Sequence, residues 1–232
     1  NKTTHPDLTQ PKSWDDFVSV LKKLKGEGRA PFTLDSDIAG YDSYVVSAAL
    51  QRTLPANGLS DLLLDKTASK WTDPAVKTAL DAVYQLYSDD LFIKGYDASK
   101  WPAMQKEWAA NKSDFLYLGS WVPEETADYA ASGFKYGAFN FPTIGSDSNS
   151  NVPASADGFI VPAKAQNKAA AKAFLSFVYN KTRLGLFSTE VNELTPRADI
   201  PVPTPMEDIA ALIKDHDMVP VMDDVQAVQP DF

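Results

Sequence analysis

Short apolar segments alternate with amphipathic helical segments along the chain, and this alternation constrains the fold more than any other feature. Ser13 and Asp16 have the spacing of a helix-capping box, and an apolar face at helical period follows them until Gly26. Residues 30–34 are then typical of a short strand. Chains that alternate helices and strands fold as layered α/β domains. We therefore predict an α/β fold.

The same patterns place further elements along the chain. A helix is expected to start at Pro74, which suits the first helical turn and follows two residues that suit a cap. Residues 143–153 are rich in Ser, Asn and Gly and predict a loop or crossover. The prolines of residues 196–205 exclude regular structure there. Other helices are expected over residues 41–52, 101–111, 121–131, 167–180 and 206–214, and other strands over 114–118, 134–141 and 158–161.

Charge and residue usage exclude several classes of function. The 232 residues carry a formal net charge of −9 and form no cluster of Lys and Arg, so nucleic acid and anionic membrane surfaces are poor partners. There is no cysteine, which removes thiol nucleophiles and thiolate metal sites. His5 and His216 lie far apart, and neither a GxGxxG nor a Walker A pattern occurs. We expect no metal site and no cofactor.

The pair Glu124–Glu125 is the one candidate for acid–base catalysis. Two carboxyls can serve as the acid and the nucleophile or base of a glycosidase. They also follow Pro123 at the start of an expected helix, where negative charge is favourable beside the helix dipole. The second interpretation is favoured. A catalytic triad is not expected, because the sequence around Ser120 lacks the GxSxG pattern.

Aromatic residues are abundant, with 5 Trp, 9 Tyr and 12 Phe. Trp121 follows an expected strand and precedes an expected helix, which is the edge where open α/β sheets bind ligands. A flat aromatic face beside hydrogen-bonding side chains suits a sugar ring, which has apolar faces and a polar rim. The alternative is that Trp121 packs beneath the following helix.

Four segments in order resemble the family of extracellular solute-binding proteins of carbohydrate ABC importers, the group that contains maltose-binding protein. They are residues 11–17 (PKSWDDF), residues 108–121 (WAANKSDFLYLGSW), residues 141–175 with FPT, DGFIVPA and NKAAAKAFL, and residues 194–199 (LTPRAD). Asn111 and Asp157 stand where the family commonly has glycine, and Ser113 and Asp114 stand where it has small apolar residues.

The resemblance implies a two-lobe periplasmic-binding-protein-like fold of type II. In that fold this chain is mainly the C-terminal lobe, built from residues 1–143 and 196–232. Residues 144–195 are then a crossover segment that returns to the N-terminal lobe, and that lobe would precede the present chain.

The resemblance also implies a function without catalysis. The protein would be an extracytoplasmic receptor that captures a mono- or oligosaccharide and delivers it to the permease subunits of an ABC importer. It would be a monomer, either periplasmic or a cell-surface lipoprotein. Three alternatives stay open: a glycan-cleaving enzyme that uses Glu124 or Glu125, a receptor for a solute other than sugar, and a structural or adhesive surface module.

Matching the motifs residue by residue assigns ligand contacts to particular positions. Trp121 becomes the stacking platform. Arg197 binds ligand or the hinge, unless it forms an ion pair with Asp199 instead. The remaining positions implied to contact ligand are Tyr41, Tyr44, Asp42, Asp157 and Gly158.

Overall fold

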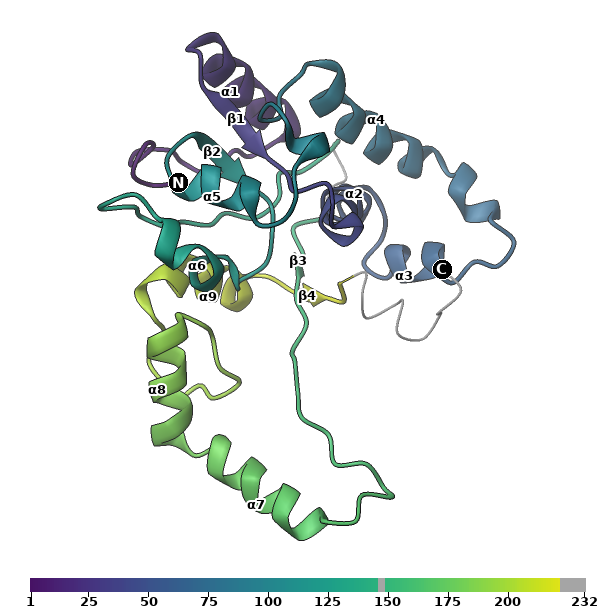
Figure 1. Ribbon diagram of the computed structural model, residues 1–232. Coiled ribbons are helices and arrows are strands. Elements are labelled where there is room, and N and C mark those ends of the chain that lie inside the picture. Colours follow the sequence, from purple (N-terminus) through teal and green to yellow (C-terminus); the bar gives the residue numbers. More distant parts are fainter. Residues whose placement is uncertain (146–148, 222–232) are drawn as a thin grey trace.

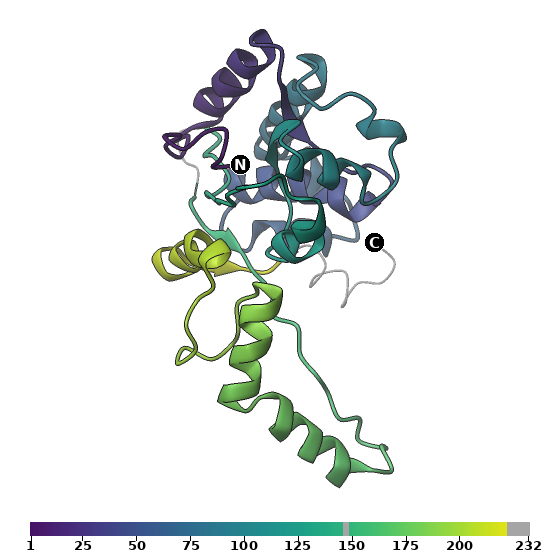
Figure 2. The same cartoon turned by 60° about the vertical axis from the view of Figure 1, so that its left-hand side comes forward.

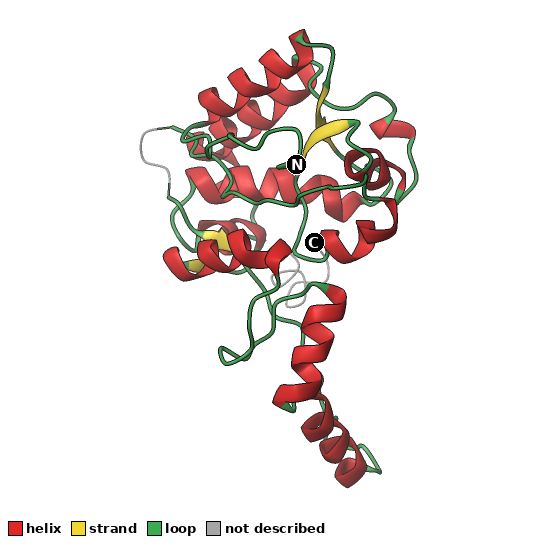
Figure 3. Ribbon diagram, turned by 90° about the vertical axis from the view of Figure 1, so that its left-hand side faces the viewer, coloured by secondary structure: helices red, strands yellow, loops and turns green. Residues whose placement is uncertain are grey.

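The computed structural model describes residues 1–145 and 149–221. Figures 1 and 2 show a body made mainly of helices around short strands. Residues 154–203, which we call the arm, project from this body and carry two helices (Figure 3). No helix within the described ranges is long and apolar enough to cross a membrane.

Two short parallel strands lie in the core of the body. Strand β1 (Ala30–Thr33) pairs with β2 (Ser113–Leu116), with Phe32 opposite Phe115. Helix α1 (Trp14–Gly26) precedes β1. It begins at the expected capping box, because the Ser13 side chain accepts from the Asp16 amide and the Asp16 carboxylate accepts from the Ser13 amide. The sequence prediction for this region is confirmed.

Helices surround these strands and bury a largely aliphatic core. Helix α2 (Ala39–Thr53) packs against α4 (Pro74–Ser88), and α5 (Ala103–Ala109) packs against β2. The shorter helices of the body are α3 (Gly58–Leu63) and α6 (Val122–Thr126), together with 3₁₀ turns at Ser69–Thr72, Tyr96–Ala98, Ala127–Tyr129 and Thr204–Met206. Leu21, Leu62 and Leu86 are among the fully buried side chains.

A second pair of parallel strands lies where the chain leaves the body for the arm, and its later strand is the last one in the described residues. Strand β3 (Val152–Pro153) pairs with β4 (Met218–Val219), which follows helix α9 (Glu207–Asp215). The Val152 amide donates to the Asp217 carbonyl at 2.9 Å. The arm therefore begins directly after β3, and α9 lies between the arm and β4 (Figure 1).

The arm exposes an unusual amount of apolar surface. Its helices are α7 (Lys168–Val178), in which no residue is buried, and α8 (Lys181–Val191). Ile160 is 86% exposed, Leu186 61% and Phe159 60%. A surface helix normally turns its apolar stripe toward a core. The apolar face of α7 that the sequence predicts is present, but it stays largely exposed, with the Phe159 ring edge-on to Phe174 and the Arg183 guanidinium over Phe177.

Two expected strands are wrong. Residues 134–141 form a loop whose later aromatics pack on α1, with the Phe141 ring 5.6 Å from the Trp14 ring and the Phe139 ring 6.1 Å from the Phe17 ring. Its earlier aromatics, Phe134 and Tyr136, pack on Trp108 of α5. Residues 158–161 lie in the arm beside no strand, and the Phe159 ring packs edge-on to Phe174. Alternation predicts a strand only where another strand is available for pairing, and neither segment has one.

Candidate functional site

Three aromatic side chains from separate parts of the sequence meet at one side of the body. Tyr41 and Tyr44 come from the first turns of α2, and Trp121 comes from the residue before α6. The ring centres are 5.9 Å apart for Tyr41 and Tyr44, and Trp121 is 6.3 Å from each. All three side chains are partly exposed. We call these residues the aromatic cluster.

The chain between β2 and α6 fixes the position of Trp121. A Cβ added to Gly119 would lie 1.9 Å from the Trp121 ring, so only glycine permits this close approach. The ring also packs partly against the small core cluster of Trp108, Ala109 and Val122. Both sequence interpretations of Trp121 therefore describe part of its environment. One portion of the ring packs into the body, and another faces the two tyrosines.

A group of polar side chains, which we call the polar recess, lies directly beside Tyr41. Asp35 follows β1, Gln105 lies in α5 and Glu125 lies in α6. The Asp35 carboxylate is 1% exposed and accepts from the backbone amides of Met104 at 3.1 Å and Gln105 at 3.2 Å. Both ends of the Gln105 amide and the Glu125 Oε2 are buried without a well-formed hydrogen bond. The recess thus holds polar groups that the described chain leaves unsatisfied.

Burial controls the ionisation of the recess. It raises the pKa of Glu125, and the charges of Glu124 and Asp35 raise this pKa further, while contacts from Gln105 and Trp101 oppose the shift. Burial also raises the pKa of Asp35, against the two backbone hydrogen bonds that it accepts. The pKa of Tyr41 is raised by burial and by the charge of Glu125. Proximity of carboxylates therefore makes the recess a place of negative potential.

Asp42 has a different environment from its neighbour Tyr41. Its charge raises the pKa values of Tyr87 and Tyr96, and it also raises the pKa of Asp35 in the polar recess. Burial raises the pKa of Asp42 itself, and a hydrogen bond from Ser36 opposes the shift. One carboxylate oxygen of Asp42 is buried without a partner. The structure therefore does not bring Asp42 into the aromatic cluster.

The other residues implied by the resemblance lie in or near the arm. Asp157 and Gly158 are exposed just beyond β3. Arg197 donates two hydrogen bonds of 2.9 Å to Asp199, which is the ion pair that the sequence left as an alternative. None of these three joins the aromatic cluster.

Glu193 is a residue near the cluster that sequence reasoning missed. Its Oε2 accepts from the Ser120 hydroxyl at 3.2 Å, directly before Trp121. Burial raises the pKa of Glu193, and the charges of Glu124 and Asp157 raise it further. Asp35 lies in a short acidic loop and Gln105 in an amphipathic helix, and neither context marks a site in the sequence.

Helix α2 connects the aromatic cluster to the chain around β3, where the arm begins, and to the chain just after β4. Near its C-terminal end Arg52 is 1% exposed and donates to the carbonyls of Phe141 at 2.9 Å and Asn151 at 2.8 Å, and to the Asn140 side chain at 2.5 Å. Gln51 donates to the Pro220 carbonyl at 2.9 Å, just after β4. Tyr41 and Tyr44 thus lie near one end of α2, and the residues that bind the chain beside β3 and after β4 lie near the other end.

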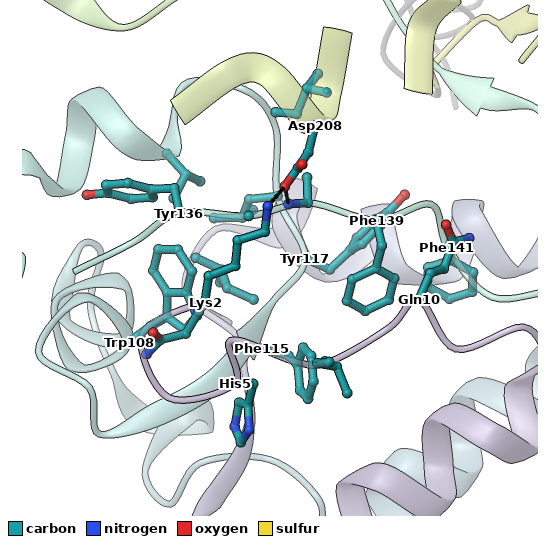
Figure 4. A pocket seen from close by; sticks show the side chains of 18 of the residues that line it. Lys2, His5, Gln10, Trp108, Phe115, Tyr117, Tyr136, Phe139, Phe141 and Asp208 are labelled. Atoms are coloured by element: carbon teal, nitrogen blue, oxygen red, sulfur yellow. Dashed lines mark hydrogen bonds and ion pairs between the residues drawn. The ribbon is translucent and has the colours of Figure 1, made fainter. Parts of the chain in front are cut away.

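A separate cavity of about 390 Å³ lies between the N-terminal segment, β2 and the loop 136–142 (Figure 4). Lys2 pairs with Asp208 at 2.6 Å across one side of it. Its walls include the aromatic side chains of Trp108, Phe115, Tyr117, Tyr136, Phe139 and Phe141. No member of the aromatic cluster lines it. We regard this cavity as a packing gap of the body, since most of these rings also pack against its core clusters.

The chain matches known proteins over most of its length. Residues 2–182 match the family described as bacterial extracellular solute-binding proteins. The diacetylchitobiose binding protein NgcE of Streptomyces coelicolor is 22% identical over 188 residues, which cover 78% of this chain and 39% of that protein. The chain therefore spans well under half the length of this curated relative.

Solved structures share the same arrangement of elements. A chitin oligosaccharide binding protein superposes with a TM-score of 0.76 at 19% identity, over 96% of this chain and 57% of that one. The solute-binding protein RafE in complex with raffinose gives a TM-score of 0.73 at 18% identity, over 94% and 58%. These likenesses confirm the α/β fold of type II predicted above, of which the present chain forms a part.

Proposed function

Because the chain belongs to the family of bacterial extracellular solute-binding proteins, we propose that it is the saccharide-binding C-terminal lobe of an ABC importer's receptor. The observation that supports this most is the aromatic cluster beside the polar recess. Aromatic faces can stack on the C–H faces of a sugar ring while carboxylates and amides accept from its hydroxyls. The relatives named for diacetylchitobiose and raffinose support the same ligand class.

The lobe boundaries are part of this proposal. Residues 1–143 and 196–232 form the C-terminal lobe, and residues 144–195 return to an N-terminal lobe; residues 146–148 and 222–232 lie outside the described chain. The exposed apolar surface of α7 and α8 supports this division, because such a surface needs a partner. The β3–β4 pair then lies at the hinge, and a ligand closes the lobes because only the closed form contacts both of its faces.

The place and partners of the receptor follow from the family. We place it outside the cytoplasm, as a monomer in the periplasm or as a tethered lipoprotein, where it delivers its ligand to the permease subunits. It needs no cofactor and makes no contact with nucleic acid. These statements concern the whole receptor, of which this chain is one part.

Binding without catalysis is the better account of Glu124 and Glu125. Both occupy the first turn of α6, where the helix dipole favours them. Glu124 is exposed, and only Glu125 reaches the polar recess. Members of the matching family are binding proteins. We therefore assign the pair no acid–base role.

Thermal unfolding of the full-length receptor with a panel of solutes tests the proposal. The panel contains raffinose, stachyose, diacetylchitobiose, xylobiose and galactose, together with peptides, polyamines and metal ions as solutes of other classes. A solute that binds only the folded state at a hundredfold excess over its Kd adds about 2.7 kcal/mol of stability and raises the midpoint. We expect a shift with one saccharide class. A shift only with peptides, polyamines or metal ions would keep the fold and remove the saccharide assignment.

A further inference from the structure

Gln105 has a fully buried side chain whose polar atoms lack well-formed hydrogen bonds, which is rare in protein cores. Neither the amide oxygen nor the amide nitrogen has a hydrogen bond of ordinary geometry. A buried polar group that is left without a partner destabilises the folded state. Its neighbours are the Tyr41 hydroxyl and the Glu125 carboxyl, whose pKa values it lowers. The unsatisfied amide therefore lies immediately behind the aromatic cluster.

Glu125 presents a second unsatisfied group at the same place. Its Oε2 is buried without a partner, and Trp101 and Gln105 are the groups that contact the carboxyl. An ionised carboxylate can only accept hydrogen bonds. A bound molecule that brings a hydroxyl or an N–H would satisfy this oxygen.

The charged groups around the recess have one sign. Glu124 and Asp35 act on Glu125, Asp37 and Asp42 act on Asp35, and each is a carboxylate. Lys106, the neighbour of Gln105 in α5, instead places its ammonium 4.0 Å from the centre of the Tyr129 ring. A carboxylate or phosphate on a ligand would meet like charges here, which is costly across an interface.

We propose that Gln105 and Glu125 determine specificity, so that the site takes saccharides that bring hydrogen-bond donors and no negative charge. This inference depends on the proposed receptor function and narrows its ligand class. Uronic acids and sugar phosphates are rejected by the carboxylates of the recess. Neutral sugars are accepted through a hydroxyl or an amide N–H that reaches Glu125 and the Gln105 carbonyl oxygen.

Calorimetric titration of the full-length receptor with charge-matched pairs tests the selectivity. The pairs are galactobiose with digalacturonate, xylobiose with its glucuronosyl derivative, and cellobiose with its 6-phosphate. The panel also includes diacetylchitobiose and raffinose. For the neutral probe that binds, the acidic counterpart is expected to bind at least about tenfold more weakly. Equal affinity for both members of a pair would overturn the proposal.

Glu125→Gln removes the charge and keeps the shape of the side chain. We expect it to weaken binding of the neutral probe by about tenfold and to reduce the difference in affinity between neutral and acidic probes. Glu124→Gln is the matched control, because it makes the same change one residue away on an exposed side chain. If both variants change the preference for neutral over acidic saccharides equally, that preference arises from long-range charge. The proposed specificity role of Glu125 is then wrong.

Gln105→Leu separates a binding role from a structural one. Removing an unsatisfied buried amide should leave the unfolding midpoint of the unliganded receptor unchanged or higher, while affinity for the neutral probe falls at least about fivefold. A lower midpoint with unchanged affinity would contradict the proposal. Binding of neutral and acidic sugars alike, still dependent on Trp121, would sink this inference alone. Binding of no saccharide at all would sink the receptor proposal with it.

Discussion

Buried charges in this protein have two kinds of surroundings. Asp114 is fully buried and is held by the Arg29 guanidinium and by His5 at 2.7 Å, so its charge is compensated. Glu125 and Gln105 are not satisfied in this way. Proteins usually break the rule of satisfied polar groups at functional sites. This contrast supports the proposed binding role of the polar recess, whereas Asp114 belongs to the scaffold.

Trp121→Ala should weaken saccharide binding by at least about 1 kcal/mol, because it removes aromatic surface that covers the ligand. Calorimetric titration of the full-length receptor measures the change. Trp71→Ala is the control, since Trp71 is a partly buried tryptophan in a 3₁₀ turn beside α4 and belongs to no part of the aromatic cluster. Unchanged affinity in Trp121→Ala would remove this residue from the site.

Glu125→Gln should raise the unfolding midpoint of the unliganded protein at pH 7. The folded state raises the pKa of Glu125, so ionising this carboxyl costs stability once the pH exceeds its ordinary pKa of about 4.3. The gain should shrink as the pH falls toward 4, where the native side chain is protonated as well. Thermal unfolding at both pH values measures it, and an equal gain at both would show that the charge is not its cause.

The sequence supplied part of the candidate site. The motif resemblance pointed to Trp121, Tyr41 and Tyr44, and the structure brings these rings together. Gln105 could not be found, because a glutamine in an amphipathic helix forms no pattern. The environment of Glu125 was equally hidden, since it depends on burial beside residues distant in sequence.

At the scale of elements, α2 connects the aromatic cluster to strands β3 and β4. Its 15 residues span about 22 Å at the usual rise of a helix. Tyr41 and Tyr44 lie near one end, and near the other end Arg52 binds the Asn151 carbonyl beside β3 and Gln51 binds the Pro220 carbonyl after β4. In the proposed receptor, a ligand bound at the aromatic cluster would therefore act on β3 and β4 through this helix.

Arg52→Met should lower the free energy of unfolding by about 2–4 kcal/mol, because it leaves the Phe141 and Asn151 carbonyls without their donor in a buried place. Arg52→Lys should recover part of the loss. Urea denaturation of the full-length receptor measures both, with Lys23→Met, a change at an exposed cation of α1, as control. A loss as small as that of the control would mean that solvent replaces the guanidinium.

Element prediction failed where the sequence pattern depends on a neighbour. Residues 134–141 alternate like a strand, but their aromatics pack on α1 and α5 without a ladder. Helix α8 was not predicted, because Gly185 and several β-branched residues weaken its helical propensity. The capped helices α1 and α4 were predicted correctly, since their signals are local.

At the scale of the whole molecule, the arm is the part that this chain cannot complete by itself. The rings of Phe174, Phe177 and Phe187 are each more than half exposed. The family motifs, in their order, allowed the fold to be predicted from the sequence. The partner of the arm could not be derived from the present residues, because most of the arm's apolar face is exposed within the described chain.

Phe187→Asp should destabilise the full-length receptor by about 2–3 kcal/mol or more, because the proposed N-terminal lobe would bury this side chain, and a carboxylate there would lack a partner. Tyr84→Asp makes a similar change on an exposed aromatic of α4 in the body and should have little effect. Differential scanning calorimetry compares the two. Equal small effects would show that α8 stays solvent-exposed in the whole receptor.

The pairing of β3 with β4 determines when the body can finish folding during synthesis. Val152 binds Asp217 and Ala154 binds Val219, so each partner of β3 is synthesised only after the entire arm. At about 5–20 residues per second, the ribosome needs roughly 3–13 s to pass from one strand to the other. During that interval the growing chain presents the arm's apolar helices while the body still lacks its closing strand. The body therefore cannot complete the β3–β4 pair until β4 has been synthesised, and the arm emerges before that.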